Sequence, residues 1–187
     1  NDLDLYVVSG GNEFNNRSIE LADRIYLNDG KGNFKRDTQE DLQNYTISGK
    51  TVTEIDYDND GDSDIIIGNR IQTKKYPIHE PSIIYENISG KFYNNTYNIA
   101  PEFENFGIVN KVIKTDFNND GWDDFIAVGE WTNIGLFLNE NGKLRNISIE
   151  CNLESTYSLW FNVIGTDNNI DGLNDYLVGN IGENSKY

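Results

Sequence analysis

The sequence has a single cysteine, Cys151, among its 187 residues. One cysteine cannot form an internal disulfide bond, so a fold held together by disulfides is excluded. We expect Cys151 to be a small buried apolar residue. No apolar run approaches the roughly 18 residues that a membrane-spanning helix needs, and direct insertion into a membrane is therefore not expected.

Positive charge is also scarce, because 15 lysine and arginine residues face 31 acidic residues and give a formal net charge of −16. Such a surface repels a phosphate backbone, so we expect no nucleic-acid partner. His79 is the only histidine, and no serine or cysteine has a discernible base beside it. The sequence therefore gives little support for catalysis, and we expect a protein that is not an enzyme.

Acidic residues, by contrast, are concentrated in three nine-residue loops of one design, at 56–64, 116–124 and 167–175. In each loop, positions 1, 3, 5 and 9 are Asp or Asn, and position 6 is Gly. Carboxylates packed this closely repel one another unless a cation neutralises them, and Ca²⁺ accepts about six to eight oxygen ligands. Asx-rich turns that need no metal are the alternative, but three copies in the same register favour Ca²⁺ as the cofactor.

The candidate metal ligands follow from the loop positions. We expect side-chain oxygens from positions 1, 3, 5 and 9, and a backbone carbonyl from position 7, whose side chain varies. The predicted ligands are Asp56, Asp58, Asp60, Asp62 and Asp64; Asp116, Asn118, Asp120, Trp122 and Asp124; and Asp167, Asn169, Asp171, Leu173 and Asp175. Loops two and three hold fewer carboxylates and should bind more weakly. An EF-hand is excluded, because it needs Glu at position 12 and flanking helices.

The start of the chain matches the back half of another such loop. Asp4 stands where the last Asp of each complete loop stands, and Asp2 lies two positions before it. These two residues are candidate ligands, although half a loop does not establish an intact site. We therefore expect the chain to be a piece of a longer parent protein, the remainder of which is one of its partners.

Short β-branched and aromatic runs flank every loop, which predicts strands. A second strand, a Gly-containing turn and another strand follow downstream in each unit, as in 83–92. Four strands per repeated unit are typical of β-propeller blades, so we predict an all-β fold with about three four-stranded antiparallel blades of a larger propeller. The predicted units are a partial blade over 1–45, blades over 46–100 and 101–150, and a partial blade over 151–187.

On these loops and hairpins, the chain resembles the FG-GAP and VCBS-type repeat family, whose calcium-loop blades occur in integrin α-subunits and many bacterial surface proteins. The stretches 76–82 and 179–187 look most like large Bacteroidetes repeat proteins related to the ASPIC/UnbV group. The resemblance implies a multi-bladed propeller with Ca²⁺ in the hairpin that joins the first two strands of a blade.

The same resemblance implies that the loop between the second and third strands lies on the face opposite the calcium. Two such loops are long, 10–23 and 69–82, and long loops on a rigid scaffold commonly bind partners. Two alternatives stay open. The long loops are surface insertions without a binding role, or Trp131 packs between blades and is not exposed. The candidate residues of this ligand face are Arg70, Lys74, Lys75, Tyr76, His79, Glu130 and Trp131.

Together these features predict a calcium-stabilised β-propeller module of a cell-surface or secreted protein that acts in protein or glycan binding or in scaffolding. An extracellular location, on the exterior of a bacterial outer membrane, is expected because millimolar Ca²⁺ suits weak sites. Two alternatives stay open: a propeller-based carbohydrate-active enzyme, and a passive spacer domain in an outer-membrane assembly.

Overall fold

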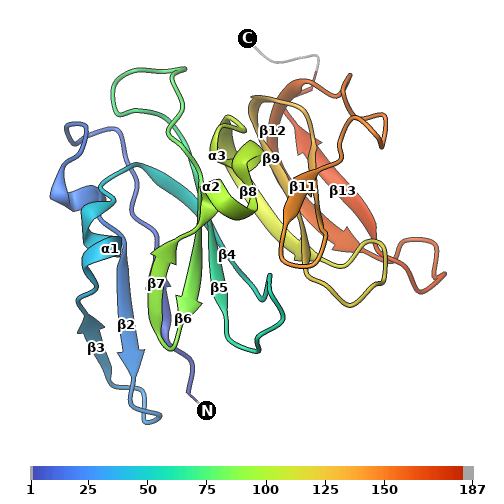
Figure 1. Ribbon diagram of the computed structural model, residues 1–187. Helices are drawn as coiled ribbons and strands as arrows, with labels where there is room; N and C mark the ends of the chain where they lie inside the picture. The colour runs from blue at the N-terminus through green and yellow to red at the C-terminus, as the bar shows by residue number, and fades with distance from the viewer. Residues whose placement is uncertain (1, 183–187) are drawn as a thin grey trace.

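The computed structural model describes residues 2–182 and consists of antiparallel sheets stacked side by side, joined by short helices (Figure 1). Asn1 and residues 183–187 lie outside the described part, and so do the ends of the predicted first and last units. Within residues 2–182, no helix is both long and apolar enough to cross a membrane.

The first sheet has three strands in the order β1-β2-β3. These strands are β1 (Leu5–Val7), β2 (Arg24–Asn28) and β3 (Phe34–Asp37). The long connection from β1 to β2 contains the 3-10 turn η1 (Ile19–Leu21), and the short helix α1 (Glu40–Asn44) follows β3.

The second sheet is a four-stranded meander in the order β4-β5-β6-β7. Its strands are β4 (Gly49–Ile55), β5 (Asp64–Asn69), β6 (Ile83–Ile88) and β7 (Lys91–Asn94). Two short helices, α2 (Thr96–Ile99) and α3 (Pro101–Glu104), lead from this sheet to the next. Proline at the first position of α3 suits a helix start, and the buried Ile99 and Phe103 anchor the two helices in the core.

The third sheet repeats the meander and is then extended by a hairpin. Its strands are β8 (Ile108–Thr115), β9 (Asp124–Thr132), β10 (Gly135–Asn139) and β11 (Leu144–Asn146), followed by β12 (Ser158–Thr166) and β13 (Asp175–Asn180). Only the end of β9 pairs with β12, where Glu130 and Thr132 lie opposite Leu159 and Ser158. This local pairing joins six strands into one hydrogen-bonded sheet.

Side chains of the central strands alternate between two cores. Ile65 and Ile67 of β5 pack toward the first sheet, whereas Ile66 packs toward the third. In β9, Phe125 faces the second sheet and Ile126 faces the β12–β13 hairpin. Successive side chains of a strand point to opposite faces, so each of these sheets is covered on both sides by its neighbours.

The expected all-β class is confirmed, and the stacked meanders are consistent with propeller blades. No closure into a ring is detected among residues 2–182. The residue ranges assigned to individual blades stay a prediction. The expectation that Cys151 is buried is wrong, because it is exposed in a turn after β11, whereas the nearby Ile147 is buried.

The two ends of the stacked sheets carry different loops (Figure 1). The acidic loops that join β4 to β5, β8 to β9 and β12 to β13 lie at the lower edge of the view. The long β1–β2 and β5–β6 connections lie at the upper edge. The strands between them therefore separate the candidate metal loops from the candidate ligand face.

Candidate functional site

The three complete acidic loops share one backbone conformation. Position 4 is left-handed in each, with φ of 58° at Asn59, 57° at Asn119 and 63° at Ile170. The glycine at position 6 has φ between 86° and 89° in all three, a region that glycine adopts without steric cost. These two left-handed residues fold the loop back on itself.

The same hydrogen bonds recur within the loops. The position-1 carboxylate accepts the glycine N–H, at 3.2 Å in Asp56–Gly61, 3.0 Å in Asp116–Gly121 and 3.0 Å in Asp167–Gly172. The position-9 carboxylate accepts the N–H of position 2, at 3.2 Å in Asp64–Tyr57, 3.1 Å in Asp124–Phe117 and 3.1 Å in Asp175–Asn168. The first and last acids of each loop are therefore held inward by backbone donors.

An asparagine at the end of the third strand ties each loop to the next hairpin. The second oxygen of Asp64 accepts the N–H of Asn87 at 2.8 Å, and the Asn87 side chain donates to the Ser63 carbonyl at 3.1 Å. Asn87 Oδ1 in turn accepts the N–H of Gly90 at 2.8 Å. This four-residue arrangement holds the position-9 acid of the loop rigidly in place.

The arrangement recurs in the neighbouring sheets. Asn139 donates its N–H to Asp124 at 2.7 Å, and Asn28 donates to Asp4 at 2.8 Å. Our ligand prediction did not include these asparagines. Their signal in the sequence is that each stands at the same place in the three hairpin motifs, directly after a Tyr/Phe-Leu or Tyr-Glu pair.

Loop 56–64 alone brings three carboxylates together in the described part of the chain. Asp56, Asp58 and Asp64 each offer one oxygen, and these oxygens lie within 4.8 Å of one another. Asp56 Oδ1 is buried and has no hydrogen-bond partner. Asp60 lies outside this group, and its carboxylate accepts the N–H of Asp62 at 2.9 Å.

In the second loop, the position-1 oxygen that corresponds to Asp56 Oδ1 accepts a hydrogen bond, and the position-5 carboxylate accepts two others. Asp116 Oδ1 accepts the N–H of Asp120 at 3.1 Å, and the Asn118 amide donates to Asp120 Oδ2 at 2.8 Å. The N–H of Trp122 donates to the other Asp120 oxygen at 2.9 Å. An amide at position 3 thus replaces the repulsion between two carboxylates with a hydrogen bond.

The third loop has the same pattern. Asp171 donates its N–H to Asp167 at 3.1 Å and accepts from the Asn169 amide at 2.9 Å and from the N–H of Leu173 at 2.8 Å. At the start of the chain, Asp4 is bonded to Asn28, and Asp2 is exposed. The weaker binding expected for loops two and three stays a prediction, for which these bonds give a physical reason.

Burial makes the negative charge of the position-9 acids costly. The pKa of Asp64 is raised to about 7, chiefly by desolvation, with smaller contributions from the charges of Asp58 and Asp62. The pKa of Asp124 is raised to about 6, again chiefly by desolvation. Backbone N–H donors oppose both shifts. A cation at these loops would favour the ionised carboxylates.

The seam between the second and third sheets links the first two loops. The N–H of Asp56 donates to the Asp123 carboxylate at 2.9 Å. Lys114 bridges the same carboxylate, at 3.3 Å, to Glu54 at 3.0 Å. The position-1 acid of the first loop is therefore anchored to the second loop.

The seven residues predicted for the opposite face divide into two groups. Arg70 and Glu130 form an ion pair at 2.5 Å, and the Trp131 indole N–H donates to the Tyr76 hydroxyl at 2.6 Å. His79 lines a cavity together with Glu130 and Trp131. Lys74 and Lys75 are outside this cluster and contact Asn15 and Gln72, respectively.

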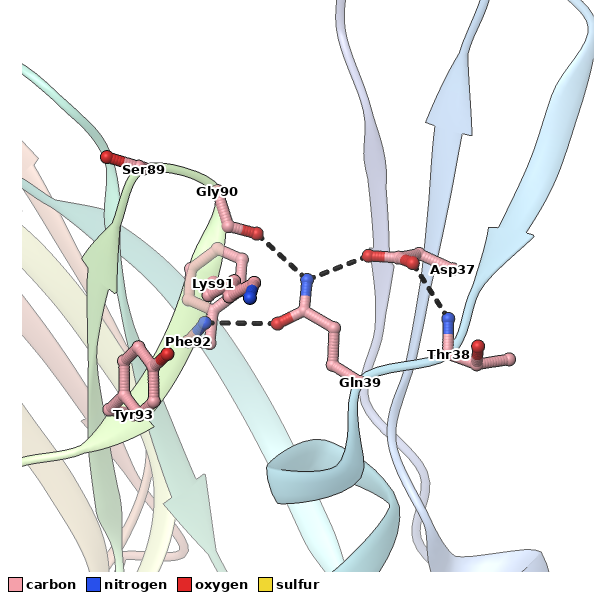
Figure 2. A pocket seen from close by; sticks show the side chains of 8 residues that line it. All are labelled: Asp37, Thr38, Gln39, Ser89, Gly90, Lys91, Phe92 and Tyr93. Carbon is pink, nitrogen blue, oxygen red and sulfur yellow. Dashed lines mark hydrogen bonds between the residues drawn. The ribbon is translucent and has the colours of Figure 1, made fainter.

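A further cavity of about 530 Å³ lies between the outer edges of the first two sheets (Figure 2). The Gln39 side chain spans it, donating to Asp37 at 2.8 Å and to the Gly90 carbonyl at 2.9 Å, and accepting the Phe92 N–H at 3.0 Å. The amide thus fastens the β3 edge to the β6–β7 hairpin, and these bonds give the groove a structural role.

Comparison with known proteins agrees with this architecture over part of the chain. No curated protein matches the sequence. A family model described as FG-GAP-like repeat matches residues 1–67. That range contains the first sheet, the strands β4 and β5 up to Ile67, and the loop in which three carboxylates converge. Over residues 1–67 the chain therefore matches the FG-GAP-like repeat, which confirms the resemblance expected from its acidic loops and hairpins.

Proposed function

We propose that this chain is a calcium-stabilised propeller module of a cell-surface or secreted protein, and that it acts by binding or scaffolding a protein or glycan partner. The observation that carries the proposal is the convergence of Asp56, Asp58 and Asp64 within 4.8 Å. The match of residues 1–67, which contain this loop, to an FG-GAP-like repeat supports it.

The residues of loop 56–64 fit a hard divalent cation. All three converging ligands are carboxylates, the donor type that Ca²⁺ prefers, and the buried Asp56 Oδ1 has no protein partner. Asp60 and the Asp62 carbonyl complete the set that we propose. Ca²⁺ would supply charge neutralisation here and take no part in a reaction. Loops 116–124 and 167–175 would bind Ca²⁺ with lower affinity.

Ion binding would stabilise more than the loop itself. The Asp64 carboxylate is bonded to Asn87 in the β6–β7 hairpin, and the backbone N–H of Asp56 donates to Asp123 in the neighbouring acidic loop. An ion that fixes these acids would therefore order the seam between two sheets. The partner would contact the opposite face, where the long β5–β6 loop and the end of β9 meet.

We place this module outside the cell, on the exterior of a bacterial outer membrane or in the medium, because sites with few carboxylates fill only at high Ca²⁺ concentration. Extracellular Ca²⁺ reaches the millimolar range that such weak sites require.

Thermal unfolding with and without chelator tests the proposal. The melting temperature of the Ca²⁺-loaded chain should fall in EDTA, because an ion that binds only the folded state stabilises it. D58N should reduce this difference, whereas E154Q, which removes an exposed carboxylate outside the loops, should leave it unchanged. Identical melts of the wild type in Ca²⁺ and EDTA would contradict the proposal. Hydrolysis of a polysaccharide by the wild type that is lost in E130Q and kept in D58N would instead favour a carbohydrate-active enzyme.

A further inference from the structure

Two adjoining cavities on the face opposite the acidic loops share a wall made by Trp131 and Tyr157. The smaller, of about 350 Å³, is also lined by His79 and Glu130. The larger, of about 450 Å³, is lined by polar groups that include Asn133. Trp131 lies near the end of β9, the strand that begins at the acidic loop 116–124. The two cavities are therefore a whole strand length away from the metal loops.

The backbone holds Trp131 in a conformation that packing does not require. Its φ is 58°, a left-handed value that costs a residue with a side chain on the order of 1–3 kcal/mol. Trp131 is 45% exposed, so burial in the core does not offset this cost. Glu130 and Thr132 pair with successive residues of β12, which leaves Trp131 as the extra residue of a bulge. Bulges commonly redirect a side chain next to a functional site.

The orientation of the indole ring is fixed by one hydrogen bond. Trp131 Nε1 donates to the hydroxyl of Tyr76 at 2.6 Å. Tyr76 lies in the long connection between β5 and β6. Tyr157, the other residue of the shared wall, is 62% exposed. The two accessible aromatic residues, of which Trp131 is held in place, give the cavities an aromatic platform for a ligand that has an apolar face.

Polar atoms around this platform have no partner in the protein. Thr132 is 4% exposed, and its hydroxyl makes no hydrogen bond. Asn133 Oδ1 is also buried without a partner, and both residues line the larger cavity. Buried polar atoms are bonded in the great majority of cases. These two groups therefore indicate a ligand that both donates and accepts hydrogen bonds.

Charge around the cavities argues against an anionic ligand. Glu130 lines the smaller cavity and Glu102 the larger, and neither lining contains a lysine or arginine. Arg70 pairs with Glu130 Oε1 at 2.5 Å. Within residues 2–182, no hydrogen bond reaches the second carboxylate oxygen of Glu130, which remains an acceptor for a hydroxyl group.

We propose that these two cavities bind a neutral oligosaccharide, an assignment that deepens and rests on the proposed binding function. One sugar ring stacks on Trp131 through its apolar C–H face, and its hydroxyl groups bond to Thr132, Asn133 and Glu130. Sugars combine an apolar ring face with hydroxyls that donate and accept, which matches an aromatic platform ringed by unpartnered polar atoms.

The test uses the full chain in Ca²⁺, first screened against an array of neutral and acidic oligosaccharides and then titrated by calorimetry with the best neutral binder. W131A should weaken binding about tenfold or more, because it removes the stacking surface. T132V keeps the side-chain volume and removes a hydroxyl that the protein does not use. It should weaken binding about threefold to tenfold while the melting temperature is unchanged or higher.

Y97A removes an aromatic ring that is 77% exposed outside both cavities and should leave the affinity unchanged. Absence of binding to any neutral oligosaccharide by the folded, Ca²⁺-loaded chain would overturn the inference, and so would equal affinity of wild type, W131A and T132V. Specific binding of a protein and of no oligosaccharide would reject the assignment of a neutral oligosaccharide as the ligand, and the proposed binding function would still hold. A melting temperature insensitive to EDTA would contradict the calcium proposal without changing the glycan result.

Discussion

The Asn139 side chain donates a hydrogen bond of 2.8 Å to the backbone carbonyl of Tyr57, across the seam between two neighbouring sheets. The same amide donates to the Asp123 carbonyl at 3.0 Å, and its oxygen accepts the N–H of Gly142 at 2.8 Å. Asn139 is 1% exposed. One buried amide thus connects both acidic loops of this seam to the β10–β11 hairpin.

Replacing this amide should destabilise the fold strongly. N139A leaves the Tyr57 and Asp123 carbonyls and the Gly142 N–H without their partner, and buried unsatisfied groups cost about 1–3 kcal/mol. We expect the free energy of unfolding to fall by about 2–4 kcal/mol in a urea titration. N16A, at an exposed residue outside the acidic loops and the strands, is the control and should change it by less than about 0.5 kcal/mol. Equal stability of the two variants would show that the seam does not depend on Asn139.

A pH-dependent difference should arise at Asp23 in the first sheet. Its carboxylate accepts the Tyr6 hydroxyl at 2.8 Å and the Ser9 N–H at 2.6 Å, and desolvation raises its pKa to about 6. Because the folded pKa exceeds the unfolded one, the stability that protonated Asp23 confers is complete below about pH 4. That contribution is lost as the pH rises through 6.

D23N cannot ionise, so its stability relative to the wild type should improve between pH 4 and pH 7, by up to about 3 kcal/mol. Urea unfolding of both proteins at pH 4, 5.5 and 7 measures the difference, in which the other titrating groups cancel. A difference that is constant with pH, or that favours the wild type at pH 7, would contradict the assigned pKa shift.

The third acidic loop contains one residue, Ile170, whose backbone conformation is strained and can be relieved by substitution. Ile170 has φ of 63° and is 89% exposed, whereas Asn occupies the same position in the other two loops. A β-branched residue is disfavoured in this region, and Asn tolerates it. I170N should therefore raise the free energy of unfolding by about 1 kcal/mol without loss of packing. A matched I149N change, at an isoleucine that is 76% exposed and has no positive φ, should give no gain. An unchanged or lower stability of I170N would rule out strain at this position.

The second loop should gain calcium affinity from one carboxylate. N118D restores the residue found at position 3 of the first loop and removes the Asn118–Asp120 hydrogen bond. We expect Ca²⁺ affinity of this loop to rise about tenfold, and stability in EDTA to fall because two carboxylates then repel each other. N119D adds the same charge one position later, outside the expected ligand set, and should leave affinity nearly unchanged. Calorimetric titration that finds the same affinity for both variants would reject the assigned ligand positions.

The sequence predicts most of this architecture because both of its main signals are periodic. Short β-branched runs closed by Gly, such as 65–69, predict strands, and this run forms β5, all of whose residues are buried. Repeated Asp, Asn and Gly positions predict the loops, whose backbone is equivalent in all three copies. Asn87 and Asn139 were missed as structural partners, since their hydrogen bonds join strands distant in sequence.

Other features depend on tertiary contacts that no local pattern contains. The short helices α2 and α3 form because Ile99 and Phe103 enter the core between two sheets. Tyr157 joins Trp131 only because β12 pairs with the end of β9. Burial of Cys151 was predicted from residue type alone, and the turn after β11 exposes it.

Calcium titration into the wild type and D58N, followed by calorimetry, tests the central claim most directly. Asp58 is one of three acids whose oxygens lie within 4.8 Å, and its carboxylate accepts the Asp60 N–H at 3.3 Å, the longest of the backbone hydrogen bonds to these three acids. We predict that the wild type shows one site stronger than the rest, and that D58N weakens this site to about the level of the others, because Asn then occupies position 3 of every loop. Identical titrations of the two proteins, or no heat of binding in the wild type at millimolar Ca²⁺, would contradict the account.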